Sequence, residues 1–306
     1  MGANLKEVRE RIKSVSSTQQ ITRAMKMVSA AKLRRAQQAI QQMRPYSVKM
    51  NEMLKNIMSN IDPAEASTSF GVKREINNVL LVVVTSNRGL CGGFNSNVIK
   101  ETLASIEAKY TAQKDAKKVT IMCIGKKGYD VFKKRSSEFN VIDTYINLFE
   151  DLSFNNISPV ADEIMDGFTA GNYDAVEVIY QRFKNAAVQI PQAEQYLPVV
   201  TTLEDNSSHA ADKKSKTSKA DYIFEPNKKQ LLEQLIPSIL QNQFQKCLLD
   251  THASEHGARM TAMDAATENA EELKKSLKIS YNKARQEAIT SEISEIVGGA
   301  AALEGS

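Results

Sequence analysis

Two stretches of the sequence carry residue types whose spacing could support chemistry, and the first is a pair of histidines. His252 and His256, with Glu255 before the second, match the H-x-x-E-H pattern of one class of zinc proteases. Histidines four residues apart on a helix share a face and can bind one metal. Such a site would need a third ligand, and the only other histidine is His209, in a polar segment. An Asp or Glu side chain as third ligand stays open as an alternative. Two polar residues on a solvated helix face are the favoured interpretation, so no metal site is predicted.

The second stretch is the glycine-containing segment 86–95, with the sequence SNRGLCGGFN. It follows an apolar run and opens a helical pattern, which is the context of phosphate-binding loops. Its spacing fits neither G-x-G-x-x-G nor the P-loop. A tight strand-to-helix connection is therefore favoured here and at residues 125–128, with a nucleotide-binding enzyme as the alternative. No Ser/His/Asp or Cys/His set is recognisable, so we predict no catalytic residue and no cofactor.

The composition favours a folded protein whose charge is unevenly spread. The chain has 306 residues, of which 42% are hydrophobic, and a net charge of +4. Residues 1–50 hold 11 basic and 2 acidic side chains, a net charge of +9, whereas residues 225–306 hold 9 and 12, a net charge of −3. No stretch approaches 18 uncharged apolar residues, so no transmembrane helix is expected. A basic first segment leaves a nucleic-acid scaffold as an alternative, but it has no aromatic residue before Tyr46 for base stacking.

The cysteines and the N-terminus point to a soluble intracellular protein. Cys91, Cys123 and Cys247 are odd in number and far apart, which argues against a disulfide framework. The basic N-terminus has no apolar core of a secretory signal.

The first sixty residues read as one helix of a coiled coil. Apolar residues recur at steps of three and four, with a change of register expected near residues 28–33. The expected seam positions are Leu5, Val8, Ile12, Val15, Ile21, Met25, Val28, Leu33, Ala36, Ile40, Met43, Ser47, Met50, Leu54, Ile57 and Ile61. Pro45 should kink this helix without ending it. If continuous, it would be on the order of 85 Å long.

The middle of the chain reads as a layer of parallel strands and helices. Apolar runs at 79–84, 119–124 and 175–180 alternate with helical patterns at 95–114, 128–135 and 159–170. A later strand is expected at 196–203. Residues 62–75 read as a linker, and 204–220 as a mobile polar loop.

The last eighty residues return to a helical pattern. Pro237 should kink the helix or separate a short helix from the main one, and Gly298-Gly299 should end it. Its seam is expected to be rich in small residues, namely Ala253, Ala258, Ala262, Ala265, Ala266 and Ala270. The predicted fold class is α/β: a long antiparallel two-helix coiled coil formed by residues 1–61 and 226–297, with a central Rossmann-like α/β domain at 76–221.

Four separated motifs resemble the gamma subunit of the F-type (rotary) ATP synthase. They occur in the family's order and span nearly the whole chain, and they are residues 12–28 (IKSVSSTQQITRAMKMV), 88–95 (RGLCGGFN), 253–263 (ASEHGARMTAM) and 281–300 (YNKARQ, ITSE and GGA). The resemblance also accounts for the zinc-like pattern, because Glu255 and His256 lie inside a family helix motif.

The resemblance implies a mechanical role without catalysis. It implies a central-stalk rotor inside a ring of three alpha and three beta subunits, with the α/β domain as a foot near the epsilon subunit and the c-ring. Ion flow would turn the rotor and drive ATP synthesis or hydrolysis in the beta subunits. Membrane association would come only through the complex. The expected location is the cytoplasmic face of a bacterial inner membrane, with a processed organellar chain as the alternative.

Five residues match family positions with a role in subunit contact or coupling. Arg285 and Gln286 match positions that contact a catch loop of the beta subunit. Met25, Arg259 and Thr290 match positions important for coupling in the upper shaft. From the residues alone, Met25 would be seam packing and Arg259 a solvated charge.

Overall fold

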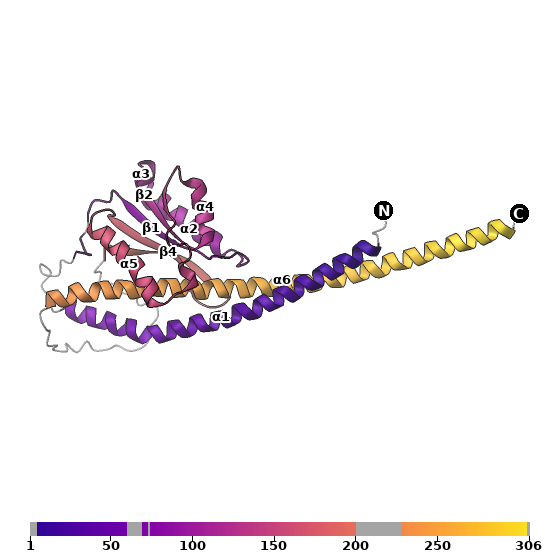
Figure 1. Ribbon diagram of the computed structural model, residues 1–306, viewed down its shortest axis with the longest axis horizontal. Helices are drawn as coiled ribbons and strands as arrows, with labels where there is room; N and C mark the ends of the chain where they lie inside the picture. Colours follow the sequence, from indigo (N-terminus) through magenta and orange to yellow (C-terminus); the bar gives the residue numbers. More distant parts are fainter. Residues whose placement is uncertain (1–4, 60–68, 73, 200–227, 305–306) are drawn as a thin grey trace. The chain divides into compact units, whose positions relative to one another are not determined.

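The computed structural model in Figure 1 describes residues 5–59, 69–72, 74–199 and 228–304. The chain forms two compact units, one made of Met1–Ala30 with Arg259–Ser306 and the other of Ala31–Ala258. Two long helices, α1 (Leu5–Ser59) and α6 (Lys228–Glu304), each contribute to both units. The expected loop at 204–220 lies outside the described residues, as does most of the linker at 62–75.

The second unit is built around a five-stranded sheet of order β3-β2-β1-β4-β5. The strands are β1 (Val79–Val84), β2 (Val119–Ile124), β3 (Asn140–Ile142), β4 (Ala175–Phe183) and β5 (Gln189–Leu197). The first four are parallel and β5 pairs antiparallel with β4. The parallel α/β layer is therefore confirmed. The short edge strand β3 was not predicted, and the strand expected at 196–203 was misplaced, because β5 runs from Gln189 to Leu197.

Helices cover both faces of the sheet, which explains why its central strands are apolar on both sides. The helices between the strands are α2 (Phe94–Lys109), α3 (Thr111–Asp115), α4 (Lys126–Phe132) and α5 (Phe154–Thr169), with short 3-10 turns η1 (Lys133–Arg135) and η2 (Leu148–Glu150). Val98 and Ile106 of α2 pack on one face, whereas Ile157 and Ile164 of α5 pack on the other. All six residues of β1 are fully buried.

The first part of α6 belongs to the core of this second unit. Ile236, Leu240 and Phe244 join the same apolar cluster as α5 and the sheet. Ser254 donates a hydrogen bond to the Gln181 carbonyl of β4 at 3.0 Å. A Cβ atom at Gly257 would lie 3.3 Å from backbone atoms of the β4–β5 turn, so glycine permits this close approach.

A buried carboxylate in β4 ties the sheet to α2. Glu177 is only 2% exposed, although the strand reads as apolar in sequence. It accepts hydrogen bonds from Ser105 at 2.9 Å, Lys109 at 2.7 Å and Tyr110 at 2.8 Å. Burial raises the pKa of Tyr110, the neighbouring Glu177 charge adds to this, and both keep the phenol protonated as a donor. The three donors explain how a buried charge is tolerated.

The seam of α1 differs from the predicted one. Buried or half-buried side chains keep steps of three and four without a change of register, at Leu5, Val8, Ile12, Val15, Gln19, Thr22, Lys26, Ser29, Leu33, Ala36, Ile40, Met43, Ser47 and Met50. Ile21 and Val28 are instead 59% and 56% exposed. The prediction followed apolar residues and passed over the polar Gln19, Thr22 and Ser29, which hold the seam positions.

Two predicted ends within α6 are wrong. No separate short helix precedes Pro237, because α6 runs through it, and the core packing of Ile236 and Leu240 on either side offsets a proline cost of about 3 kcal/mol. The helix also runs through Gly298 and Gly299 to Glu304. Each glycine costs only about 1 kcal/mol relative to alanine, and alanines follow directly. Ala265, expected in the seam, is exposed.

Candidate coupling surface

The first unit is an antiparallel pair of helix segments. Side-chain contacts between described residues join α1 to α6, among them Arg9 with Tyr281 at 3.0 Å, Thr22 with Thr267 at 2.7 Å, and the ion pair of Lys26 with Asp264. Moving 17 residues forward along α1, from Arg9 to Lys26, moves 17 residues back along α6. Such constant register over about 25 Å is the pattern of an antiparallel coiled coil.

The seam of this pair is more polar than that of a typical coiled coil. On α6 the buried and half-buried positions again follow steps of three and four, at Met263, Thr267, Ala270, Lys274, Leu277, Tyr281, Ala284 and Ala288. At its outer end the Arg9 guanidinium lies 5.8 Å from the centre of the Tyr281 ring. The hydrogen bond from Arg9 lowers the pKa of Tyr281. Hydrogen bonds and ion pairs therefore supply much of the specificity of the pairing.

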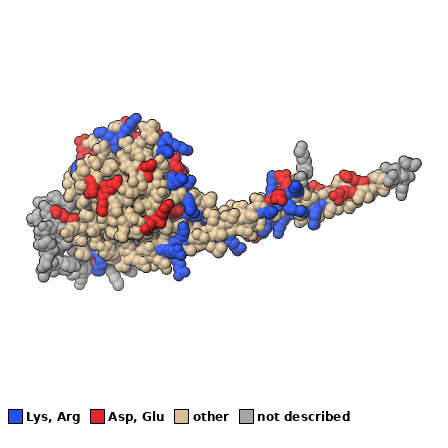
Figure 2. Space-filling model, in the orientation of Figure 1, with Lys and Arg blue, Asp and Glu red and all other residues tan. Residues whose placement is uncertain are grey.

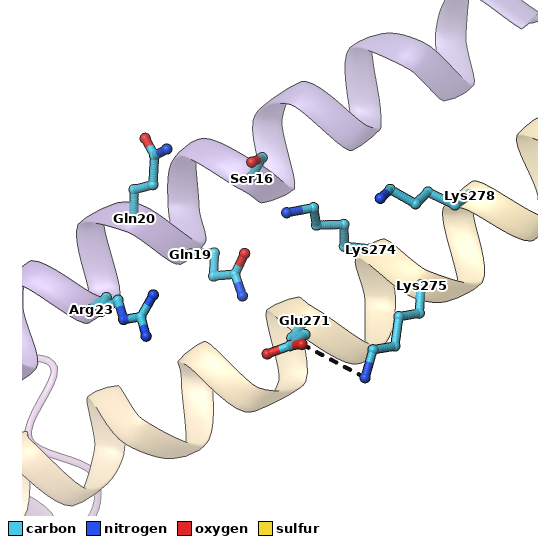
Figure 3. A pocket seen from close by; sticks show the side chains of 8 residues that line it. All are labelled: Ser16, Gln19, Gln20, Arg23, Glu271, Lys274, Lys275 and Lys278. Carbon is cyan, nitrogen blue, oxygen red and sulfur yellow. Dashed lines mark ion pairs between the residues drawn. The ribbon is translucent and has the colours of Figure 1, made fainter.

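A basic groove opens between the two helices within this unit. Its volume is about 570 Å³ and its lining consists of Ser16, Gln19, Gln20, Arg23, Glu271, Lys274, Lys275 and Lys278. We call this set the basic groove. Figure 3 shows Lys274 and Lys278 extending from α6 toward the space beside Ser16 and Gln19. Figure 2 shows blue Lys and Arg side chains gathered along this helix pair, with red Asp and Glu side chains beside them.

All five residues that the sequence singled out lie in the first unit. Met25 is half-buried, and Arg259 is only 7% exposed, so the interpretation of Arg259 as a solvated charge is wrong. Arg285, Gln286 and Thr290 are exposed on one stretch of α6, where the Thr290 hydroxyl donates to the Gln286 carbonyl at 2.9 Å.

The structure brings three of these five residues together and separates the other two from them. In the register of the pair, Arg285 lies opposite Leu5, whereas Met25 lies opposite the stretch of α6 just after Asp264. This places Met25 and Arg285 about 20 residues apart along the pair, or about 30 Å. The candidate surface therefore has two regions, one at each end of the first unit.

The end of α6 is a helix with exposed apolar side chains. Beyond Arg285, the register has no counterpart among the described residues of α1, which begins at Leu5. The exposed apolar side chains are Ile289, Ile293, Ile296 and Val297, with exposed fractions of 47%, 55%, 71% and 61%. Apolar side chains that recur at helical spacing and face solvent are typical of a surface covered in an assembly. Sequence reasoning missed them because it followed only small seam residues.

The histidine pair lies in the second unit and is not solvated, contrary to the prediction. His256 is 5% exposed, and the half-buried His252 stacks on Phe149 with ring centres 6.2 Å apart. The two Nε2 atoms are 3.1 Å apart, a hydrogen bond in which one ring donates and the other accepts. Among the residues that the structure describes, no group of three His, Cys, Asp or Glu side chains is arranged to hold a metal.

The glycine-containing loop after β1 is closed by its own side chains. The amide of Asn95 donates to the Ser86 hydroxyl at 2.9 Å, and the Ser86 backbone N–H donates to the Asn95 side-chain oxygen at 3.0 Å. The Ser86 hydroxyl also lies 2.7 Å from the Arg88 carbonyl. These bonds join the two ends of the loop, as a structural strand-to-helix connection requires.

The turn between β2 and α4 is likewise structural. Gly125 has φ of 95°, and a Cβ there would lie 2.0 Å from the Thr85 carbonyl oxygen. The Thr85 hydroxyl accepts the Gly128 N–H at 2.8 Å, which satisfies one of the free donors at the start of α4. This turn therefore requires glycine at position 125, and the Gly128 N–H at the start of α4 is bonded within the protein.

Comparison with known proteins gives matches over the full chain. A family model described as ATP synthase matches residues 4–303. The chain is 53% identical over 303 residues to the ATP synthase gamma chain of Flavobacterium psychrophilum, covering 99% of this chain and 100% of that protein. It is 51% identical over 300 residues to the gamma chain of Cytophaga hutchinsonii, covering 98% and 99%.

Solved structures show the same fold at low sequence identity. A chain of the Euglena gracilis mitochondrial ATP synthase, from the cryo-EM structure of its OSCP/F1/c-ring part, aligns with a TM-score of 0.62 and 20% identity, covering 98% of this chain and 94% of that one. The fold and the family model together define an ATP synthase subunit. The two gamma chains match at more than 50% sequence identity over nearly the whole chain, and they identify which subunit it is: the chain belongs to the ATP synthase gamma-chain family. No described helix is both long and apolar enough to cross a membrane.

Proposed function

We propose that this chain is the central-stalk rotor subunit of an F-type ATP synthase. It turns inside a ring of three alpha and three beta subunits and couples ion flow through the membrane sector to ATP synthesis or hydrolysis. The chemistry takes place in the beta subunits, and this chain contributes no catalytic group. The family membership supports this proposal, and the antiparallel helix pair of the first unit is the observation that carries it.

The helix pair suits the transmission of torque. A single helix bends easily, whereas two helices joined at several points along their length resist bending and twisting. Contacts at Arg9, Thr22 and Lys26 distribute this joining along the pair. In the proposal, residues 1–61 and 226–297 form the shaft and residues 76–221 form the foot, which contacts the epsilon subunit and the c-ring.

The exposed surface of the first unit supports contact with a surrounding ring. Ile21, Met27 and Val28 on α1 are 56–63% exposed, and Ile296 and Val297 near the end of α6 are also exposed. These side chains lie outside the seam, so their burial would contribute to assembly with another protein. A rotating surface also requires contacts that are broken and remade, which suits dispersed apolar side chains better than one deep interlocked patch.

Five residues are proposed to couple rotation to the catalytic sites. Arg285 and Gln286 would contact the catch loop of a beta subunit, and their exposure leaves both side chains accessible. Met25, Arg259 and Thr290 would support coupling in the upper shaft. Arg259 would act by fixing the local geometry of α6, because its side chain is buried.

The proposed location follows from the proposed partners. The chain would be a peripheral protein on the cytoplasmic face of a bacterial inner membrane, held there only by the rest of the complex. The relatives from Flavobacterium psychrophilum and Cytophaga hutchinsonii are bacterial proteins, which supports this placement over an organellar one.

The decisive experiment is assembly with alpha and beta subunits. Coexpression should give a complex with one copy of this chain per three alpha and three beta subunits, measured by native mass spectrometry. Failure to enter an alpha-beta ring would overturn the proposal. Within the assembled complex, truncation before Ala284 should weaken the coupling of ATP hydrolysis to ion pumping in vesicles.

A matched pair of variants tests the residue assignments separately from assembly. Arg285→Ala with Gln286→Ala should lower coupled pumping per ATP hydrolysed, while Lys283→Ala, exposed on the same helix, should not. Equal pumping ratios in both variants would remove the proposed role of Arg285 and Gln286 but leave the rotor proposal intact.

A further inference from the structure

The basic groove of the first unit concentrates positive charge that its own residues do not balance. Four cationic side chains and one carboxylate line it. The carboxylate, Glu271, lies 3.7 Å from Lys275, and both are well exposed. Within the described part of the chain, Arg23, Lys274 and Lys278 form no ion pair. The groove therefore holds excess positive charge between two helices.

Lys274 occupies a position where a coiled coil normally has an apolar residue. It continues the α6 seam between Ala270 and Leu277, and it is half-buried. Register places it opposite Ser16. A lysine at a seam position lowers the stability of a coiled coil. Lys278, four residues further along, carries a like charge on the same helix face, which adds repulsion.

We propose that the basic groove binds a free multivalent anion of the phosphate class, such as pyrophosphate or tripolyphosphate. Lys274, Lys278 and Arg23 supply the charge, and the Ser16 hydroxyl and Gln19 amide supply neutral hydrogen-bond donors from the facing helix. Such an anion bridges α1 and α6 and offsets the repulsion between the two lysines. The site lies within the first unit, so it does not depend on the proposed rotor function.

The lining selects the chemistry of the ligand. A volume of about 570 Å³ is within the range of small-molecule sites. The lining is polar and contains no aromatic residue, so a nucleobase has no ring on which to stack. Ammonium groups and a guanidinium fork are the groups that bind phosphate oxygens best. The favoured ligand is thus the phosphate chain itself.

Binding is measured by isothermal titration calorimetry on the full chain at constant ionic strength of about 0.1 M, with tripolyphosphate as the probe. One equivalent should bind saturably. The double variant Lys274→Gln/Lys278→Gln should bind about tenfold more weakly, because two charge-assisted contacts are lost. The matched control Lys13→Gln/Lys283→Gln removes two positive charges from exposed positions of α1 and α6. Its dissociation constant for tripolyphosphate should stay within twofold of the wild-type value.

Three results would overturn the proposal. Equal weakening in the double variant and its control would mean that the anion responds only to overall charge. Tighter binding of hexaglutamate than of tripolyphosphate would assign the groove to an acidic protein segment. Lack of saturable binding, with Lys274→Gln raising the melting temperature, would mean that Lys274 serves only to set the helix register. Circular dichroism of each variant shows whether the helices are intact.

Discussion

Replacing Asp250 with asparagine is expected to stabilise the folded chain at neutral pH. Asp250 lies on the first part of α6, where its side chain is 7% exposed. Burial raises its pKa to about 6, and Glu194 of β5 adds to this, whereas Lys246 and Arg182 act in the opposite direction. The folded state therefore holds the proton of Asp250 more tightly than the unfolded state, in which the pKa is 3.8.

The size and sign of the effect follow from this difference. A tenfold change in proton affinity corresponds to about 1.4 kcal/mol, so ionising Asp250 in the folded chain costs about 3 kcal/mol. Below pH 3.8 both states are protonated and the cost is absent. Between pH 3.8 and 6 the folded state binds more protons, so Asp250 lowers stability progressively as the pH rises. Above pH 6 the full cost applies.

Urea unfolding of the full chain, followed by far-UV circular dichroism at pH 4 and pH 7.5, measures this effect. Asp250→Asn should raise the free energy of unfolding by up to about 3 kcal/mol at pH 7.5 and have little effect at pH 4. Asp115→Asn, at an exposed position, serves as the control and should change neither value by more than about 0.5 kcal/mol. A stabilisation of equal size at both pH values would refute the reasoning, because the gain would then not come from ionisation.

Four other substitutions have expected effects on the free energy of unfolding of the full chain, measured by urea unfolding. Gly125→Ala should destabilise it by about 3 kcal/mol or more, because its φ of 95° is strained for alanine and a Cβ would overlap the neighbouring backbone. Val8→Ala should lower the free energy of unfolding by about 2 kcal/mol and Ile21→Ala by less than about 0.5 kcal/mol, because Val8 is buried in the seam and Ile21 is exposed. The reverse order of the two effects would contradict the observed seam. Glu177→Leu should lower the free energy of unfolding by about 3 kcal/mol, because it leaves the buried Tyr110 hydroxyl without a hydrogen-bond acceptor. An unchanged urea midpoint would contradict this role of Glu177.

The sequence predicted the parallel strands and both long helices because their patterns are strong. The three long apolar runs can be buried on both faces only inside an α/β layer, and each became a strand. The short strand β3 (Asn140–Ile142) has three residues and no apolar run, so only its pairing with β2 defines it. The edge strand β5 contains Pro191 and several polar residues, which local patterns do not distinguish from a loop.

The seam of the helix pair could not be predicted in full because polar side chains occupy it. Thr22 is buried because Thr267 of the other helix bonds to its hydroxyl, and that partner is 245 residues away in sequence. The exposure of Ile21 follows from the same register. A pattern search that ranks residues by hydropathy therefore selects Ile21 and misses Thr22. The partial burial of His252 was missed for a similar reason, since Phe149, which stacks on its ring, comes from a different segment of the chain.

The two parts of α6 are held by different interactions, and this difference leads to a last prediction. Residues such as Leu240 and Phe244 are fixed in an apolar core, whereas the part after Arg259 is held by a polar seam and ends in exposed helix. Hydrogen bonds and ion pairs near water contribute about 1 kcal/mol or less each, and burying a Leu or Phe side chain contributes about 2–3 kcal/mol.

Local opening should therefore be easier in the second part of α6 than in the first. Hydrogen exchange of the full chain, read by mass spectrometry, should show amides of residues 259–297 exchanging at least tenfold faster than those of residues 236–256. Assembly with alpha and beta subunits should slow exchange at 286–297 most, because the exposed Ile293 and Ile296 would then be covered. Uniform protection along the free helix would mean that the polar seam holds α6 as firmly as the apolar core does.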